Sequence, residues 1–332
     1  MKFLKIILCI FAVFCVCFAH GEHGKSVVVP AVPKTANKAA NDSKAGKKSI
    51  VCTIFPQYDW VKEILGDNAQ NFQITYLLNS GIDMHNYAPS VKDVAAISNA
   101  DLFIYVGGES DKWVEGVIKK ANNKKMLTLA LSNSVEKYAE EFVEGMQNFG
   151  SEEEIDEHIW LSLKNAQKSV GVITNAICKL DETNAETYRA NAKNYVSKLA
   201  ELDKKYEEMV KNSPQKTILF GDRFPFLYLV KDYGLNYYAA FVGCSAETEA
   251  SFETIAFLSK KVDELGLKTI LVTETSNKQI ANTIKSNSKS KNAEILVMNA
   301  CQSITDKHIA GGTTYLLLMT ENLNVLTKAL AK

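Results

Sequence analysis

Two histidines stand out among the residues that could support chemistry. The chain has five, at positions 20, 23, 85, 158 and 308, and His85 and His158 lie in polar segments beside otherwise apolar elements. Neutral imidazole is the commonest metal ligand in proteins. A single histidine in a loop is more often a surface or hydrogen-bonding residue, and the separation of these two along the chain imposes no geometry. We therefore treat His85 and His158 as a possible metal site. Whether they can form one depends on the elements that position them.

Strands and helices alternate around both histidines. Short β-branched runs predict buried strands, and their alternation with helices predicts a parallel sheet covered on both faces. Pro89 and the pattern Ser90-x-x-Asp93 predict a helix that starts directly after the His85 segment. The predicted strands of the first half are residues 50–55, 72–78, 102–105 and 126–130, with helices at 58–65 and around Trp113 and Val117. The loop that carries His85 is therefore expected to be held at both ends.

The longest predicted helix spans residues 181–212. Its apolar residues recur at spacings of three and four and so share one face. They are Tyr188, Ala192, Tyr195, Leu199, Leu202, Tyr206 and Met209, and Ser213-Pro214 ends the helix. Beyond it, strands are predicted at 217–220, 236–240, 269–273 and 294–298, and helices at 225–233, 249–265 and 278–286. The second half is therefore predicted to be another α/β lobe.

The N-terminal residues predict export. Residues 1–19 have a basic start, an apolar run too short to span a bilayer as a helix, and Cys17-Phe18-Ala19 where a signal peptidase cuts. We expect them to be a signal peptide, and we expect residues 20–48, which have no sustained period, to be a flexible linker. A lipid anchor is not favoured, because Phe14 and Val16 stand where small residues should precede the modified cysteine.

Composition and charge exclude several classes of protein. The 332 residues are 46% apolar and 23% charged, an ordinary globular balance with enough chain for two domains. Residues 49–332 hold thirty bases and thirty-six acids, and this formal charge of −6 argues against nucleic acid as a partner. No glycine-rich phosphate motif follows a predicted strand, so a nucleotide site has no support. The acidic loop at 131–157 is either an electrostatic funnel for a cation or an ordinary solvated loop.

From about residue 49 to residue 332 the chain resembles the solute-binding proteins of zinc and manganese ABC importers. The matching motifs are Phe55-Pro56-Gln57-Tyr58-Asp59; Gly81-x-Asp83-x-His85-x-Tyr87-x-Pro89-Ser90; Ala100-Asp101-Leu102 with Tyr105; Trp113-Val114-Glu115; and His158-Ile159-Trp160-Leu161 with Asn165-Ala166. The resemblance implies two Rossmann-like lobes with parallel sheets, at 49–180 and 214–332, joined by one long rigid helix at 181–213. It places a metal site in the cleft between the lobes, with His85 and His158 as ligands.

Two carboxylates of the second half complete the expected site. Open α/β sheets bind ligands beyond the carboxyl ends of their strands, and Asp222 and Glu274 each follow a predicted strand. The resemblance expects histidine or glutamate near the first position, so Asp222 departs from the pattern, and Arg223 could hold it in an ion pair instead. Asn277 competes with Glu274. Two neutral imidazoles and two carboxylates would cancel the charge of a divalent cation. We expect zinc first, with manganese or iron as alternatives.

The remaining candidates are four cysteines and one histidine. Cys52, Cys178, Cys244 and Cys301 lie outside the signal, and their spacing matches no Cys-x-x-Cys metal pattern. Export permits a disulfide, and Cys244 with Cys301 is the favoured pair because each falls just after a predicted second-half strand; two buried thiols are the alternative. His308 has no counterpart as a ligand in the resembling family, and we leave it outside the site.

The resemblance implies a receptor rather than an enzyme. Such a protein works outside the cytoplasm, captures a divalent metal ion and delivers it to the permease of an ABC transporter at the membrane, and we expect it to be a monomer. A secreted metal-dependent hydrolase is the main alternative. That activity needs an open coordination position beside a base, and neither His-Glu-x-x-His nor Gly-x-Ser-x-Gly is present. A metal-binding adhesin is a third interpretation.

Overall fold

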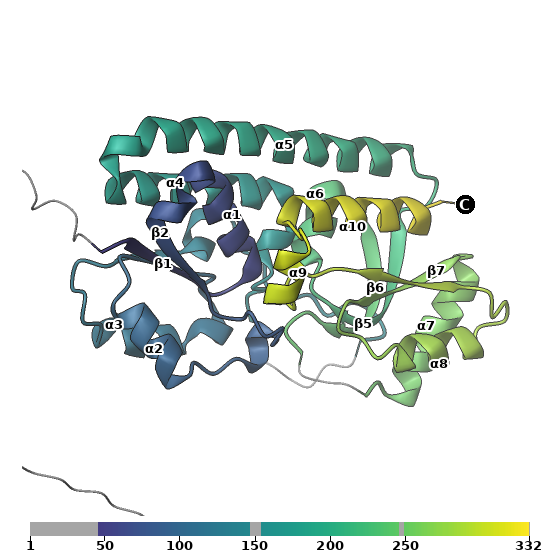
Figure 1. The fold of residues 1–332 in the computed structure, drawn as a ribbon. Coiled ribbons are helices and arrows are strands. Elements are labelled where there is room, and N and C mark those ends of the chain that lie inside the picture. The colour runs from purple at the N-terminus through teal and green to yellow at the C-terminus, as the bar shows by residue number, and fades with distance from the viewer. Residues whose placement is uncertain (1–45, 147–153, 246–248, 332) are drawn as a thin grey trace, which may run out of the picture. The chain divides into compact units, whose positions relative to one another are not determined.

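The strands of this computed structural model form two parallel four-stranded sheets (Figure 1). Residues 46–146, 154–245 and 249–331 are described. The first sheet has the order β2-β1-β3-β4, from β1 (Lys48–Cys52), β2 (Phe72–Tyr76), β3 (Leu102–Tyr105) and β4 (Leu127–Ala130). The second has the order β6-β5-β7-β8, from β5 (Thr217–Phe224), β6 (Asn236–Val242), β7 (Thr269–Thr273) and β8 (Glu294–Met298). The predicted fold class, two α/β lobes with parallel sheets and a long helix, is confirmed.

Helices cover both faces of each sheet, as the alternation of elements predicts (Figure 1). The first half contains α1 (Phe55–Leu65), α2 (Val91–Ser98), α3 (Trp113–Lys119) and α4 (Leu163–Leu180). After α5 (Ala185–Asn212) follow α6 (Leu227–Tyr233), α7 (Phe252–Glu264), α8 (Gln279–Asn287), α9 (Asp306–Ala310) and α10 (Tyr315–Ala329). The sequence pattern does not predict helices α4, α9 and α10.

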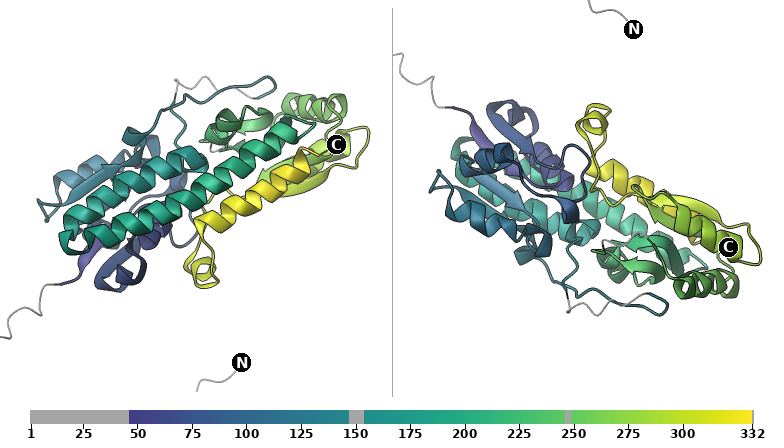
Figure 2. Two further views of the ribbon diagram at one scale, coloured as in Figure 1. Left: turned by 90° about the horizontal axis from the view of Figure 1, so that it is seen from above. Right: turned by 90° about the horizontal axis from the view of Figure 1, so that it is seen from below.

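Helix α5 runs across both halves of the described chain. Its 28 residues give a length of about 42 Å, and it lies beside α4 at one end and α10 at the other (Figure 2). Its buried face is the predicted one, except that Met209 is only partly buried and Val210 is buried instead. The helix begins at Ala185, later than predicted, because Asp181 ends α4 and accepts a hydrogen bond from the Tyr188 hydroxyl at 2.6 Å.

The hydrophobic core is continuous beneath α5. One cluster of buried side chains includes strands of both sheets, such as Phe103 of β3 and Phe220 of β5, together with Tyr206 of α5. A second, smaller cluster fills the space between the second sheet and helices α7 and α8, with Leu258 and Ile284 among its members. Because the larger core joins both sheets, the two halves are built around one apolar interior.

Strand β5 differs from its prediction in a way that affects the site. It continues to Phe224, four residues beyond the predicted end, because the neighbouring β6 also continues to Val242 and keeps pairing with it. The pairing shifts register between Phe220 and Arg223. Asp222 therefore lies within this irregular part of the strand and does not follow its end, as the sequence had predicted.

Several predictions fall outside the described residues. The signal peptide, most of the linker and residues 147–153 of the acidic loop are among them. Within the described ranges, no helix combines the length and the apolar character needed to cross a membrane.

Candidate metal centre

His85 is held in a single helical turn between β2 and α2. The turn spans Met84–Asn86, and the side chain of Asp83 accepts a hydrogen bond from the backbone N–H of His85 at 3.0 Å. Met84 is buried and anchors the turn to the core. At the other end the predicted capping box is confirmed, because the Ser90 hydroxyl accepts from Asp93 N and the Asp93 carboxylate accepts from Ser90 N. The loop is therefore fixed on both sides of the imidazole.

His158 precedes a second turn, Ile159–Leu161, whose side chains are all buried. One oxygen of Asp156 accepts both from the backbone N–H of His158, at 2.8 Å, and from its Nδ1, at 3.1 Å. Trp160 donates its indole N–H to the carbonyl of Ala300 at 2.8 Å, which ties this turn to the second half of the chain. The imidazole of His158 has no solvent exposure, so it is fixed where the two halves meet.

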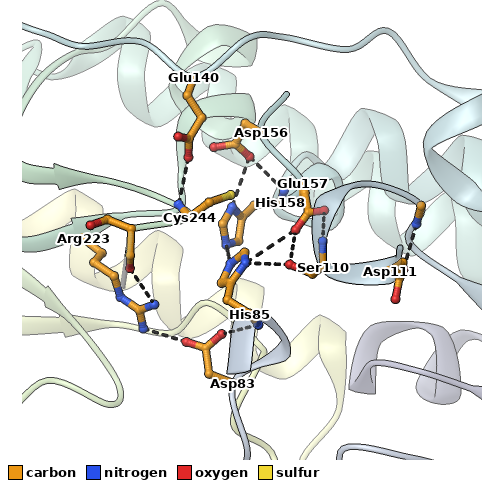
Figure 3. Close-up of polar contacts among 12 residues, drawn as sticks. Asp83, His85, Ser110, Asp111, Glu140, Asp156, Glu157, His158, Arg223 and Cys244 are labelled. Carbon is orange, nitrogen blue, oxygen red and sulfur yellow. Dashed lines mark hydrogen bonds and ion pairs between the residues drawn. The ribbon is translucent and has the colours of Figure 1, made fainter. Parts of the chain in front are cut away.

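The two imidazoles face each other with their Nε2 atoms 3.2 Å apart (Figure 3). His85 Nδ1 lies 2.8 Å from the Ser110 hydroxyl oxygen, and that hydroxyl donates to Glu157 at 2.5 Å. Ser110 therefore accepts from His85 Nδ1–H, just as Asp156 accepts from His158 Nδ1–H; these partners assign the tautomers. Both Nε2 atoms are left to share a single proton or to bind a cation between them.

Burial and neighbouring charges shift the pKa values of the two imidazoles in opposite directions. Burial, together with the neighbouring His158, lowers the pKa of His85 to about 3. Burial also opposes a charge on His158, but the carboxylates of Asp156, Glu157 and Asp83 together outweigh it and raise the pKa of this ring. Of the two rings, His158 is therefore the one whose surroundings favour the shared proton. A metal ion that binds both nitrogens would replace that proton.

A third possible ligand atom comes from Cys244. Among the described residues, one set of three ligand atoms lies within 4.8 Å of one another, and it joins the sulfur of Cys244 to His85 and His158. Cys244 lies two residues beyond β6, and its backbone N–H donates to Glu140 at 2.8 Å. The favoured disulfide between Cys244 and Cys301 is wrong, because both thiols are free. The sequence did contain a signal for Cys244 as a site residue, because it follows a predicted strand. The same rule selected Asp222 and Glu274.

Asp222 does not contact the histidines. One carboxylate oxygen accepts from the backbone N–H of Arg223 at 2.8 Å, and the other accepts from the N–H and hydroxyl of Thr273 at 3.1 and 2.7 Å. The guanidinium of Arg223 donates instead to Asp83 at 2.6 Å, across from the first half of the chain. Asp222 therefore bridges β5 and β7, and its role as a ligand stays a prediction.

Glu274 also has backbone partners. It accepts from the N–H groups of Ala300 at 2.8 Å and Gln302 at 3.4 Å. Burial raises its pKa. It lines a small pocket together with Asp83 and Arg223, the pair that joins the two halves beside His85. Its role as a ligand likewise stays a prediction.

The two residues weighed against this set lie elsewhere. Asn277 is exposed and accepts from the backbone N–H of Gln279 at 2.9 Å. His308 is exposed in α9, where its ring accepts from the N–H of Thr305 at 3.1 Å and so completes a capping box. Both side chains have local roles at helix starts.

Residues 50–329 match the family described as zinc-uptake complex component A, periplasmic. The chain belongs to this family. The zinc-binding protein AdcA of Streptococcus pyogenes is 30% identical over 294 residues, which cover 85% of this chain and 56% of that protein. The high-affinity zinc uptake system protein ZnuA of Bacillus subtilis is 30% identical over 318 residues, which cover 92% and 94%. The chain thus spans little more than half the length of AdcA and nearly all of ZnuA.

Solved structures of family members have the same fold. The Zn(II)-bound ZnuA-like domain of Streptococcus pneumoniae AdcA is similar with a TM-score of 0.70 and 29% identity, over 86% of this chain and all of that one. The metal-dependent lipoprotein YcdH of Bacillus subtilis is similar with a TM-score of 0.71 and 29% identity, over the same shares. The resemblance to metal-importer receptors is therefore confirmed at the level of family and fold.

Proposed function

We propose that this chain is the solute-binding receptor of a metal ABC importer. It captures a divalent transition metal outside the cytoplasm, zinc first and manganese second, and delivers it to a membrane permease as a monomer without chemistry of its own. The observation that carries this is the 3.2 Å separation of the two Nε2 atoms. Two nitrogens bound to zinc at 2.0–2.1 Å and the tetrahedral angle lie about 3.3 Å apart. The spacing of the two nitrogens therefore already matches that of a bound ion.

The outer partners of the imidazoles support the same function. Metal-binding histidines usually give their other N–H to a carboxylate, a carbonyl or a water, which fixes the ring and strengthens its donor nitrogen. Asp156 fills this role for His158, and Ser110 backed by Glu157 fills it for His85. Both carboxylates are buried and lie beside the site, so they also offset the charge of a bound cation.

The rest of the ligand set is part of the proposal. Asp222 and Glu274 would complete the site from the second half once their carboxylates leave their present backbone donors. The proposal divides the chain into a first lobe at 49–180, a linking helix at 181–213 and a second lobe at 214–332. Ligands from both lobes would surround one ion. Zinc is placed first because the relatives named above are zinc-binding proteins and because mixed nitrogen and oxygen ligands suit it.

Removal of both imidazoles tests this function. We expect the double variant His85→Ala, His158→Ala to lose stoichiometric zinc binding in titration calorimetry, because both nitrogens are removed. His308→Ala is the matched control, since that ring only caps α9, and it should bind as the parent protein does. A double variant that still binds one zinc ion with unchanged affinity would contradict the proposed site.

A further inference from the structure

We propose that the thiolate of Cys244 is a metal ligand, so that the receptor binds its ion through two histidines and one cysteine. This inference rests on the proposed function and changes the ligand set given for it. Its sulfur and the ligand nitrogens of His85 and His158 form the one such set of three found among the described residues. The three residues come from three separate segments, and Figure 3 shows their side chains converging.

The distances suit tetrahedral coordination after a small closure. Zinc bonds of about 2.3 Å to sulfur and about 2.05 Å to nitrogen place the sulfur about 3.6 Å from each nitrogen. The three ligand atoms already lie within 4.8 Å of one another. The two nitrogens already have the spacing that a bound ion requires, so the sulfur has to approach each of them by no more than about 1.2 Å.

The segment that carries Cys244 is built against His158. At Gly243 a Cβ atom would lie 3.1 Å from Cε1 of His158, 3.1 Å from Asp156 and 2.9 Å from the carbonyl of Phe224. A side chain at this position would push the segment away from the imidazole. Glycine therefore lets the backbone pass close to the ring, and the bond from Cys244 N–H to Glu140 fixes the next residue.

The second half of the chain thus offers a ligand two residues beyond β6, the strand beside β5. On β5 the expected ligand, Asp222, is held by Thr273. Cys244 lies beyond the carboxyl end of its strand, where open α/β sheets bind their ligands. The thiol takes the place of the histidine or glutamate that the family resemblance expects from β5.

Charge around the thiol favours a cation as its partner. The carboxylates of Asp156 and Glu140 lie against the segment that carries Cys244. A bound divalent cation is attracted by these carboxylates and stabilises the thiolate directly. Sulfur ligands favour zinc and other thiophilic ions over manganese. The substrate class is therefore a thiophilic divalent transition metal.

Cobalt spectroscopy of the exported protein tests the thiolate. Co²⁺ is the probe, because cobalt bound to a thiolate shows a near-ultraviolet charge-transfer band that nitrogen and oxygen ligands do not give. We expect this band in the parent protein and in Cys178→Ser, a control that changes a buried free thiol of α4. Cys244→Ser should bind cobalt without the band and should bind zinc at least tenfold more weakly, with a smaller loss for manganese.

The outcomes separate this inference from the function it rests on. A parent protein that binds neither cobalt nor zinc contradicts the proposed function itself. Stoichiometric binding with no thiolate band, or an unchanged zinc affinity in Cys244→Ser, overturns only the role of Cys244. If that variant does not fold, the parent protein decides: bound zinc should protect Cys244 from iodoacetamide, as peptide mass spectrometry would show, and equal alkylation with and without zinc rejects the ligand.

Discussion

At the scale of residues, the centre depends on which partners hold each polar side chain. His85 and His158 have their Nδ1 atoms occupied and their Nε2 atoms turned toward each other. Asp222 and Glu274 have the opposite arrangement, because backbone N–H groups already occupy their carboxylates. An imidazole with one nitrogen fixed presents the other to a metal, whereas a carboxylate must give up hydrogen bonds before it can bind an ion.

Amide replacements separate ligation by these carboxylates from their structural role. If each binds the ion, Asp222→Asn and Glu274→Gln should weaken zinc binding at least tenfold, about 1.4 kcal/mol, because the charge is lost while the shape is kept. Titration calorimetry measures this, with Asn277→Ala as the control that should change nothing. An unchanged Kd in Asp222→Asn would assign that carboxylate to Thr273 alone, and a loss confined to Asn277→Ala would reverse the choice between Asn277 and Glu274.

At the scale of elements, buried polar contacts fix how the helices meet. Helices α1 and α10 are far apart in sequence, and the carboxylate of Asp59 in α1 accepts from the backbone N–H of Tyr315 at the start of α10, at 2.8 Å. The Tyr315 hydroxyl donates to the carbonyl of Trp160 at 2.6 Å, in the turn after His158. These contacts link helices α1 and α10 to the turn that follows His158, a proposed ligand.

The charge of Asp59 should make stability depend on pH. Burial raises its pKa to about 7, against about 3.9 in an unfolded chain. Between these values the folded protein holds a proton that the unfolded chain has released, so the free energy of unfolding should fall as pH rises from about 4 to 7. Asp59→Asn cannot ionise and keeps an acceptor for Tyr315. Urea unfolding across this range should therefore show a smaller fall for the variant.

Glu321→Gln, an exposed change on α10, serves as the control for this comparison and should keep the slope of the parent protein. Parallel curves for Asp59→Asn and the parent protein would show that Asp59 has no raised pKa in the folded state.

At the scale of the whole described molecule, the two sheets share one core but meet at a polar site. The ion pair between Asp83 and Arg223 and the bond from Trp160 to Ala300 both join the two halves beside the histidines. A metal ion held by ligands from both halves would add to these contacts. Because such an ion binds only the folded chain, it should stabilise the whole fold.

Zinc should therefore raise the melting temperature. A thousandfold excess over Kd stabilises the native state by about 4 kcal/mol, which corresponds to a shift of several degrees in a thermal scan. Manganese should give a smaller shift, and the double variant His85→Ala, His158→Ala should give none with either ion. Equal shifts with zinc and manganese would contradict a receptor that prefers zinc.

The sequence by itself determined the elements whose signals are local. The bounds of β3, β7 and β8 agree with their predictions, and so does the Ser90 capping box. The buried face of α5 follows from its spacing of three and four. Each of these depends on residues within a turn or two of one another, so propensity and periodicity suffice. The family motifs likewise selected His85 and His158, whose imidazoles lie next to each other in the structure.

Only the tertiary structure decided which side chains meet. Strand β5 runs past its predicted end because β6 continues beside it, and this places Asp222 against Thr273. Cys244 lies beside the two histidines because the chain passes close to His158 at Gly243. It does not form the predicted disulfide with Cys301. These contacts join residues tens of positions apart, and no local pattern encodes such distances. The order of strands in the second sheet and the packing between the two halves set them.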